Sequence, residues 1–129
     1  MPQPEGKVLC DAAKAGKLDE VEAAVDAGAP MEWANPDYYG HRAVAAASAR
    51  GHKDVVAFLH SRGADVNAVD DHQYTPLHWA AYHGHPAVCS TLLALGADTT
   101  AKKDGKTALD IARQGSKTEC VAVLGAAMQ

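Results

Sequence analysis

The sequence predicts an all-α solenoid of short helix-turn-helix units, and three observations support this fold class. First, residues 70–101 describe one complete unit, and shifting it back by 33 residues aligns it with a second copy at 37–69. Second, short apolar stripes recur at helical spacing, and each is followed by a glycine. Third, the chain is 47% hydrophobic but contains one phenylalanine. Helices packed closely through alanine are therefore favoured over a core of large aromatic side chains.

The unit at 70–101 is expected to contain two helices. Thr75 should cap the first one, because its hydroxyl can accept from the free N–H groups of the first turn, and a proline at position 76 loses no hydrogen bond there. Gly84 should end this helix in the left-handed conformation. The second helix should run from Pro86 to just before Gly96. The apolar stripes of the two helices are Leu77, Ala80 and Ala81, then Val88, Cys89, Leu92 and Leu93.

The neighbouring units repeat this order with local changes. In the unit at 37–69, Gly51-His52 stands at the place of Gly84-His85, and the loop before Asp37 is two residues longer than the one before Asp70. Looser units are expected at 4–36, without the Thr-Pro start, and at 102–129, one residue short at the turn near Gly115. Both resemble end caps, which need polar outer faces. We therefore expect four units, a single domain over 1–129 and no further domain.

The segment 75–81, TPLHWAA, together with Gly84-His85 and the turn 96–98, resembles the ankyrin repeat residue for residue. The spacing of 33 residues is also the ankyrin period. In size and repeat count the chain is similar to the myotrophin-type single-module ankyrin proteins. The resemblance implies four ankyrin repeats, at approximately 4–36, 37–69, 70–101 and 102–129. It also implies a protein–protein interaction module or adaptor without catalysis.

Composition and motifs exclude several classes of function. A formal net charge of -4 with interspersed signs argues against nucleic acid or an anionic membrane as partner. No apolar run approaches the roughly 20 residues of a membrane span, and the first residues lack the apolar core of a secretory signal. We expect a soluble monomer of the cytoplasm, and also of the nucleus, with no cofactor. Catalytic motifs such as GxSxG, the Walker loop and HExxH are absent, so we expect no enzyme.

The cysteines and histidines are interpreted as structural. Three cysteines, an odd number without a CxxC pair, fit reduced thiols: Cys10, Cys89 and Cys120. Of the seven histidines, His52, His78 and His85 stand at positions where the ankyrin resemblance implies hydrogen bonds to neighbouring backbone. A metal or small-ligand site in the His- and Tyr-rich loop tips is kept as the alternative function. We expect no metal ligand among these histidines.

The ankyrin resemblance also implies a concave binding surface, made by the loop tip before each first helix and by the end of that helix. All four tyrosines fall in it, and tyrosine is enriched at binding hot spots. We expect another protein as partner, with cationic or apolar protrusions that meet the tyrosines and Asp71. Trp79 is interpreted as packing, and Trp33 as either packing or surface. The mapped positions are Lys14, Tyr38, Tyr39, His41, Ala49, Arg50, Asp71, His72, Tyr74, Tyr82, His83, Lys103, Asp104, Lys106 and Gln114.

Three positions carry expectations about stability or modification. Arg42-Ala43 replaces the Thr-Pro helix start, which should remove about 1 kcal/mol of capping. Gln73 stands where the other turns have glycine, so a side chain is expected at positive φ, at a cost on the order of 1 kcal/mol. Asn67 is a candidate for β-hydroxylation by resemblance to ankyrin proteins, while the alternative is that it satisfies backbone groups of the turn.

Two expectations concern the binding surface itself. Tyr74 and Tyr82 are taken as exposed side chains that the fold does not need, so truncating either should change stability by no more than about 0.5 kcal/mol. The histidines beside them should titrate near neutrality, which predicts binding that varies between pH 6 and 8. These histidines are His41, His72 and His83.

Overall fold

The computed structural model describes residues 5–127, which form eight α-helices and one 3₁₀ helix. In chain order they are α1 (Glu5–Ala15), α2 (Leu18–Asp26), η1 (Pro36–Tyr38), α3 (Ala43–Arg50), α4 (Lys53–Ser61), α5 (Pro76–His83), α6 (Pro86–Ala94), α7 (Ala108–Gln114) and α8 (Thr118–Ala127). The start of the repeat expected at 4–36 and the end of that expected at 102–129 lie outside the described residues. None of the helices in the described part of the chain is long and apolar enough to cross a membrane.

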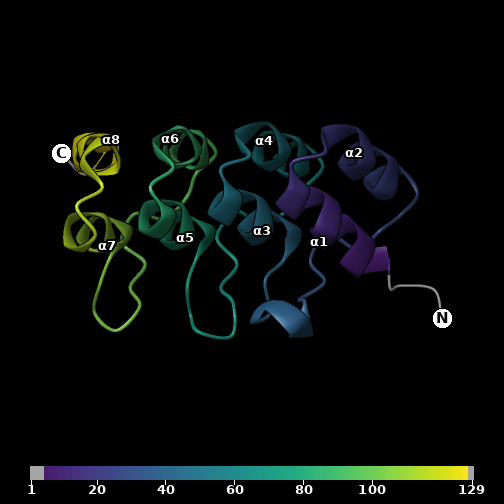
Figure 1. Cartoon of the computed structure of the whole chain (residues 1–129), viewed down its shortest axis with the longest axis horizontal. Helices are drawn as coiled ribbons and strands as arrows, with labels where there is room; N and C mark the ends of the chain where they lie inside the picture. Colours follow the sequence, from purple (N-terminus) through teal and green to yellow (C-terminus); the bar gives the residue numbers. More distant parts are fainter. Residues whose placement is uncertain (1–4, 128–129) are drawn as a thin grey trace.

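The helices pack in two rows, as Figure 1 shows. One row contains α1, α3, α5 and α7, and the other contains α2, α4, α6 and α8, with each helix in contact with its neighbours along the row. Long loops project from the first row to one side (Figure 1). Between residues 5 and 127 the structure has no strand, only isolated bridges at Asn35–His41 and Lys103–Lys106. The predicted all-α stack of helix pairs is therefore confirmed.

The start and end of α5 follow the sequence prediction. The Thr75 hydroxyl accepts from the backbone N–H of His78 at 3.2 Å, and the His78 Nδ1 accepts from the backbone N–H of Thr75 at 3.1 Å. This reciprocal pair satisfies two of the free N–H groups at the helix start. Gly84 ends the helix at a φ of 74°. At this helix, the capping residue and the terminating glycine identified from sequence are both confirmed.

The start of α3 shows the opposite situation. Arg42 occupies the capping position but its side chain makes no capping hydrogen bond. It instead reaches Glu32, whose carboxylate lies 3.3 Å away. Residues 43–49 of this helix are all buried, and five of these seven are alanine. Because α3 lacks the Thr-Pro start, its stability depends on the burial of its residues between the neighbouring helices.

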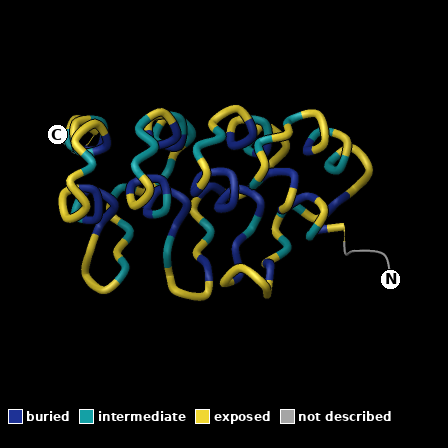
Figure 2. The backbone as a smooth tube through the Cα atoms, in the orientation of Figure 1, coloured by how far each residue is buried: buried dark blue, intermediate teal, exposed yellow. Residues whose placement is uncertain are grey.

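The core lies between and within the two rows, as the dark segments of Figure 2 show. Its largest members come from both rows and are fully buried, and alanines fill the contacts between the helices of the first row. The three cysteines are free and buried, so their expected structural role is confirmed. Trp33 is half-buried and packs against the core beside Gly6, which places it on the packing side of the two alternatives. The leucines with less than 2% of their surface exposed are Leu9, Leu59, Leu77, Leu92 and Leu124.

Three histidines connect successive helix pairs. The Nε2 atoms of His52 and His85 each lie 3.0 Å from a backbone carbonyl oxygen of the preceding pair, at Lys14 and Ala49. The Nε2 of His78 lies 3.1 Å from the carbonyl oxygen of Lys106 in the following loop. Since the carbonyl oxygens accept, each Nε2 carries the proton. The structural interpretation of these histidines is confirmed.

The last helix pair differs from expectation at its turn. Gly115 was aligned with the left-handed Gly84, but its φ is -89°. The left-handed residue is Ser116, at a φ of 56°. Ser116 follows the capping residue Thr107 by nine positions, as Gly84 follows Thr75, so Ser116 is the true counterpart of Gly84 and no residue is missing at this turn.

Candidate functional site

The projecting loops and the exposed sides of α1, α3, α5 and α7 form one surface, which we call the inner face. Two adjoining hollows on this face bring most of its predicted binding residues together. The first has a volume of about 190 Å³ and is lined by α1, η1, α3 and α5, with Tyr38, Trp79 and His83 among its walls. The second, of about 560 Å³, lies between α5, the loop at 103–106 and α7. His83 borders both hollows, so they adjoin.

Trp79 is the centre of an aromatic cluster on this face. Its ring centroid lies 4.9 Å from that of His41, 5.1 Å from that of Tyr74 and 5.7 Å from that of His83, which it stacks on at an angle of 14°. Tyr82 adds an edge contact at 6.0 Å. The cluster joins the second and third helix pairs. Aromatic pairs at such distances stabilise one another beyond the area that they bury.

A buried carboxylate holds the cluster in place. Asp70, whose side chain is 1% exposed, accepts from the indole N–H of Trp79 at 2.7 Å. Its other oxygen accepts from the backbone N–H groups of His72 and Tyr74, at 2.9 and 3.0 Å. The Nε2 of His41 lies 3.2 Å from the same oxygen that Trp79 contacts. Asp70 thus fixes the tip of its own loop, the orientation of Trp79 and the contact with the preceding loop.

The predicted surface residues differ in how much of each side chain is exposed. His41 is 7% exposed and lines the first hollow, so it is not an exposed loop residue, and its assignment as a binding residue stays a prediction. Its position opposite Asp70 explains the burial, since the two loops pack there. Tyr74 is half-buried against the core and His78, with the Lys103 ammonium 5.6 Å from its ring centroid, and half-buried Lys103 therefore partly covers it. The expectation that Tyr74 is exposed is therefore wrong, and whether the fold needs this side chain stays a prediction. The exposed members are Tyr38, Tyr39, Arg50, Asp71, His72, Tyr82, His83, Asp104, Lys106 and Gln114.

Sequence reasoning missed the role of Trp79. It was assigned to packing because ankyrin repeats commonly have leucine there, but it lines the first hollow and contacts four other rings of the inner face. A signal was present in the sequence. Trp79 precedes Tyr82 and His83 by three and four residues, which places all three on one side of a helix.

The residues that line the two hollows carry an excess of positive charge, although the whole chain is negative. The Lys14 ammonium lies 3.7 Å from the ring centroid of Tyr38 and donates to its hydroxyl. This hydrogen bond, with the charges of Lys14 and Arg50, lowers the pKa of Tyr38. Lysines also line the second hollow, at 103, 106 and 117. The expectation of a cationic partner is therefore not supported by the charge that surrounds these tyrosines.

The pKa directions correct the predicted pH response. Burial lowers the pKa of His41, although Asp70 opposes the shift, and burial followed by the charge of His85 lowers the pKa of His83. Both rings therefore lose their protons at a lower pH than an exposed histidine does. The prediction that these two histidines titrate near neutrality did not include their desolvation, which moves their titration to lower pH.

Asn67 connects two inter-repeat turns. Its side-chain oxygen accepts from the backbone N–H of Asp98 at 2.8 Å, and its amide nitrogen donates to the carbonyl of Gly96 at 3.3 Å. The interpretation that Asn67 satisfies backbone groups of the turn is confirmed. Its hydroxylation stays a prediction.

The histidines and acidic residues of residues 5–127 do not form a group of three or more that could share a metal ion. The thiols are also far from reactive. Burial raises the pKa of Cys10 and of Cys89 to about 12. A thiol with such a pKa is almost entirely protonated at neutral pH, and the thiolate is the nucleophile and metal ligand.

Comparison with protein families identifies the repeat. A family model described as ankyrin repeats in many copies matches residues 41–93, and one of three ankyrin repeats matches residues 69–127. Together they span more than half of the chain. The matched segment contains the aromatic cluster, the second hollow and half of the residues that line the first.

Similar proteins with curated descriptions are much longer than this chain. RelA-associated inhibitor of Mus musculus is 38% identical over 106 residues, which cover 80% of this chain and 12% of that protein. The E3 ubiquitin-protein ligase hecd-1 of Caenorhabditis elegans is 37% identical over 88% of this chain and 4% of its own length. The ankyrin repeat and LEM domain-containing protein 1 homolog of the same organism is 44% identical over 54% of this chain and 10% of its own length. The chain thus spans a small part of each relative.

Proposed function

Because the chain belongs to the ankyrin-repeat family, whose repeats generally mediate protein–protein interaction, we propose that it binds a partner protein through the inner face, without catalysis. The observation that carries this proposal is the exposure of aromatic rings there. Large hydrophobic side chains that stay exposed within residues 5–127 are few, and three of the five are Tyr38, Tyr39 and Tyr82, with 40, 58 and 60% of their surface accessible. Exposed tyrosines grouped on one face are typical of binding surfaces.

The size of the first hollow supports a protein partner over a small ligand. Its 190 Å³ is below the roughly 300–1,000 Å³ of pockets that enclose small molecules. A hollow of this volume suits a single side chain of a partner. The larger second hollow is lined mainly by charged and polar side chains, which suits a wet and polar contact.

We also propose that the chain acts as a monomer in the cytoplasm or nucleus. The free, buried thiols fit a reducing compartment. Asn67 stays a candidate for β-hydroxylation. Because its amide holds two turns together, an enzyme would have to open those hydrogen bonds to reach it. Peptide mass spectrometry after treatment with an asparaginyl hydroxylase tests this, and an unchanged mass for the peptide containing Asn67 would remove the proposal.

Site-specific photo-crosslinking tests the binding surface directly. A photoreactive phenylalanine analogue replaces Tyr82 on the inner face or, as a matched control, exposed Ala57 on α4 of the other row. We expect a partner protein to be captured from cell extract at position 82 and not at position 57. Capture at position 57 alone would place the binding surface on the other side and overturn the proposal.

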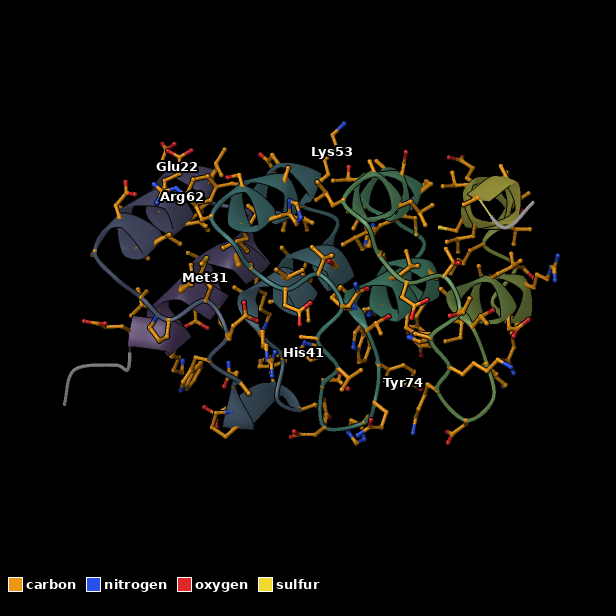
Figure 3. All side chains as sticks on the ribbon, turned by 180° about the vertical axis from the view of Figure 1, so that it is seen from behind. Glu22, Met31, His41, Lys53, Arg62 and Tyr74 are labelled. Atoms are coloured by element: carbon orange, nitrogen blue, oxygen red, sulfur yellow. The ribbon has the colours of Figure 1, made fainter. Side chains whose placement is uncertain are left out.

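The captured partner then allows an affinity measurement. Tyr82→Ala should weaken binding by about thirtyfold, which corresponds to roughly 2 kcal/mol for a hot spot. Glu22→Ala on α2 should leave affinity unchanged, since Figure 3 shows Glu22 at the outer edge, on the side opposite His41 and Tyr74. Equal affinity of both variants would exclude Tyr82 as a hot spot.

A further inference from the structure

We infer that the inner face binds an acidic segment of the partner, with one large apolar side chain seated in the first hollow and carboxylates facing the lysines and arginine around both hollows. This inference rests on the proposed function and specifies its partner by chemistry. The sequence predicted a partner with cationic or apolar protrusions; the inference keeps the apolar group and replaces the cationic one with carboxylates.

The first hollow is lined by small side chains as well as large ones. Ala46 and Ala49 of α3 line it together with the rings of Tyr38 and Trp79. Both alanines are buried, and their short apolar side chains leave the space unfilled. The indole is fixed by Asp70, so the wall is already organised before a ligand enters. Such a preformed apolar recess favours one aliphatic or aromatic side chain.

The charges around this hollow are positive. Lys14 lies over Tyr38, and Arg50 at the end of α3 is exposed beside it. Asp11 is the one carboxylate among the lining residues, and Lys7 pairs with it at 3.1 Å. An acidic group at the rim of the hollow would meet Lys14 and Arg50 with little opposition.

The second hollow is also lined mainly by positive charges. Lys103, Lys106 and Lys117 line it, against the single carboxylate of Asp104, which already pairs with Lys103 at 3.3 Å. The two linings together therefore hold five cationic side chains and two carboxylates, whereas the whole chain has 12 lysines and arginines against 16 aspartates and glutamates. This local reversal of sign is what selects an acidic partner.

The geometry also predicts a spacing. Packed helices lie about 8–10 Å apart, and an extended chain advances about 3.3 Å per residue. A segment that crosses from the first hollow to the second therefore moves by about three residues. We expect an apolar anchor with an acidic residue about three positions away. A nucleic acid could also face the cations, but it has no side chain for the apolar recess, and the net charge of -4 opposes a polyanion.

A peptide selection tests this chemistry without knowledge of the partner. A random 12-residue phage library is selected on the full chain, with counter-selection on the Arg50→Glu variant. We expect enrichment of sequences with a large apolar residue and aspartate or glutamate about three positions from it. Enrichment of lysine and arginine, sequences without net charge preference, or no enrichment above the counter-selection would each overturn the inference. So would a fluorescent single-stranded oligonucleotide that binds more tightly than the selected peptides.

Matched variants then locate the contact by fluorescence anisotropy with the most enriched peptide. Arg50→Glu should weaken binding at least tenfold, and Lys53→Glu, the same change of charge three residues later, should weaken it less than twofold. Figure 3 shows Lys53 pointing away from the molecule, on the side opposite Tyr74. Ala49→Leu should fill the first hollow and also weaken binding at least tenfold, with melting recorded to verify folding. Equal effects of Arg50→Glu and Lys53→Glu would overturn the inference.

The two proposals fail in different ways. If crosslinking at position 82 captures a partner but the selection yields no acidic peptides, the inner face remains the binding surface. The inference that the partner segment is acidic is then wrong. If crosslinking occurs at position 57 alone, both proposals fall together.

Discussion

The helices α3 and α5 hold corresponding places in successive repeats but are stabilised by different means. α5 begins with a reciprocal pair of capping hydrogen bonds between Thr75 and His78. α3 has no side-chain cap, and its residues 43–49 are buried without exception. α3 packs between α1 and α5, and α5 likewise packs between α3 and α7, so the two helices differ in how completely their residues are buried and not in having neighbours on both sides. The comparison shows that a repeat can lose its local capping signals when the stack buries it deeply enough.

The loops that precede these two helices also differ in their hydrogen bonds. In the third repeat, Asp70 ties the loop tip, Trp79 and the preceding loop together. In the second repeat, Asn35 accepts from the backbone N–H of Asp37 at 3.0 Å, and the following tyrosines are left exposed. One loop therefore organises the recess, and the other supplies accessible rings beside it.

The largest expected effect is at Asp70. Asp70→Ala removes the acceptor of two backbone N–H groups and of the Trp79 indole, so the free energy of unfolding should fall by about 3 kcal/mol. Urea unfolding measures this. Asp71→Ala, at the exposed neighbour, should cost less than about 0.5 kcal/mol. Similar losses for both variants would show that the buried network does not organise the third repeat.

Tyr74 and Tyr82 should separate packing from surface. Tyr74→Ala should lower the free energy of unfolding by about 2 kcal/mol, because a half-buried ring is lost from the core and from Trp79. Tyr82→Ala should change it by no more than about 0.5 kcal/mol, since Tyr82 is 60% exposed. Thermal and urea unfolding of the two variants give the comparison. A neutral Tyr74→Ala would restore the interpretation of Tyr74 as a free surface residue.

The contribution of capping can be tested by removing the cap of α5 and introducing one at α3. Thr75→Ala should cost about 1 kcal/mol at α5, and Arg42→Thr with Ala43→Pro should add about 1 kcal/mol at α3. The double change also removes the Arg42 Nε, which is buried without a hydrogen-bond partner. Its lost contact with Glu32 is partly exposed and contributes little. If the denaturant midpoint of the α3 variant stays the same or falls, burial already stabilises this helix and a side-chain cap adds nothing to it.

The turns allow a similar exchange with a smaller effect. Gln73 has a φ of 70° and the corresponding Gly40 a φ of 72°, so the predicted left-handed side chain is confirmed. Gln73→Gly should raise the free energy of unfolding by roughly 0.5–1 kcal/mol. Gly40→Ala should lower it, because a Cβ there would meet the Asp71 carboxylate. If Gln73→Gly destabilises the protein, the glutamine side chain has a contact that outweighs its backbone strain.

The smallest effect concerns pH. Burial lowers the pKa of His78, although its hydrogen bond with Lys106 opposes the shift, so the unfolded chain takes up a proton near pH 6.5 before the folded chain does. Stability is therefore complete above that pH and falls as the pH decreases through it, by at most about 0.8 kcal/mol for this histidine at pH 6. Protonation of Nδ1 would also remove the acceptor for the Thr75 N–H. Melting between pH 7.5 and 5.5 should show a smaller decrease for His78→Gln, and an identical decrease would assign the pH response to other groups.

Local signals in the sequence were sufficient for much of the fold. The limits of α5, the left-handed conformation at Gln73 and the hydrogen bonds of His52 and His85 all follow from a few neighbouring residues and the repeat spacing. They could be predicted because capping, positive φ and terminating glycines are properties of the backbone within one turn. The positions of Tyr38, Tyr39 and Tyr82 on an exposed face followed for the same reason, once the repeat was aligned.

The composition of the inner face depended on contacts between repeats. The burial of His41 against Asp70, the position of Trp79 at the centre of the aromatic cluster and the gathering of Lys14 with Arg50 each join residues from different helices or loops. An alignment of repeats treats a given position as equivalent in every repeat. It therefore does not show which side chain packs against a smaller side chain of the next repeat. Desolvation and local charge arise only when the units stack, and they determine which of the aligned positions remain accessible to a partner.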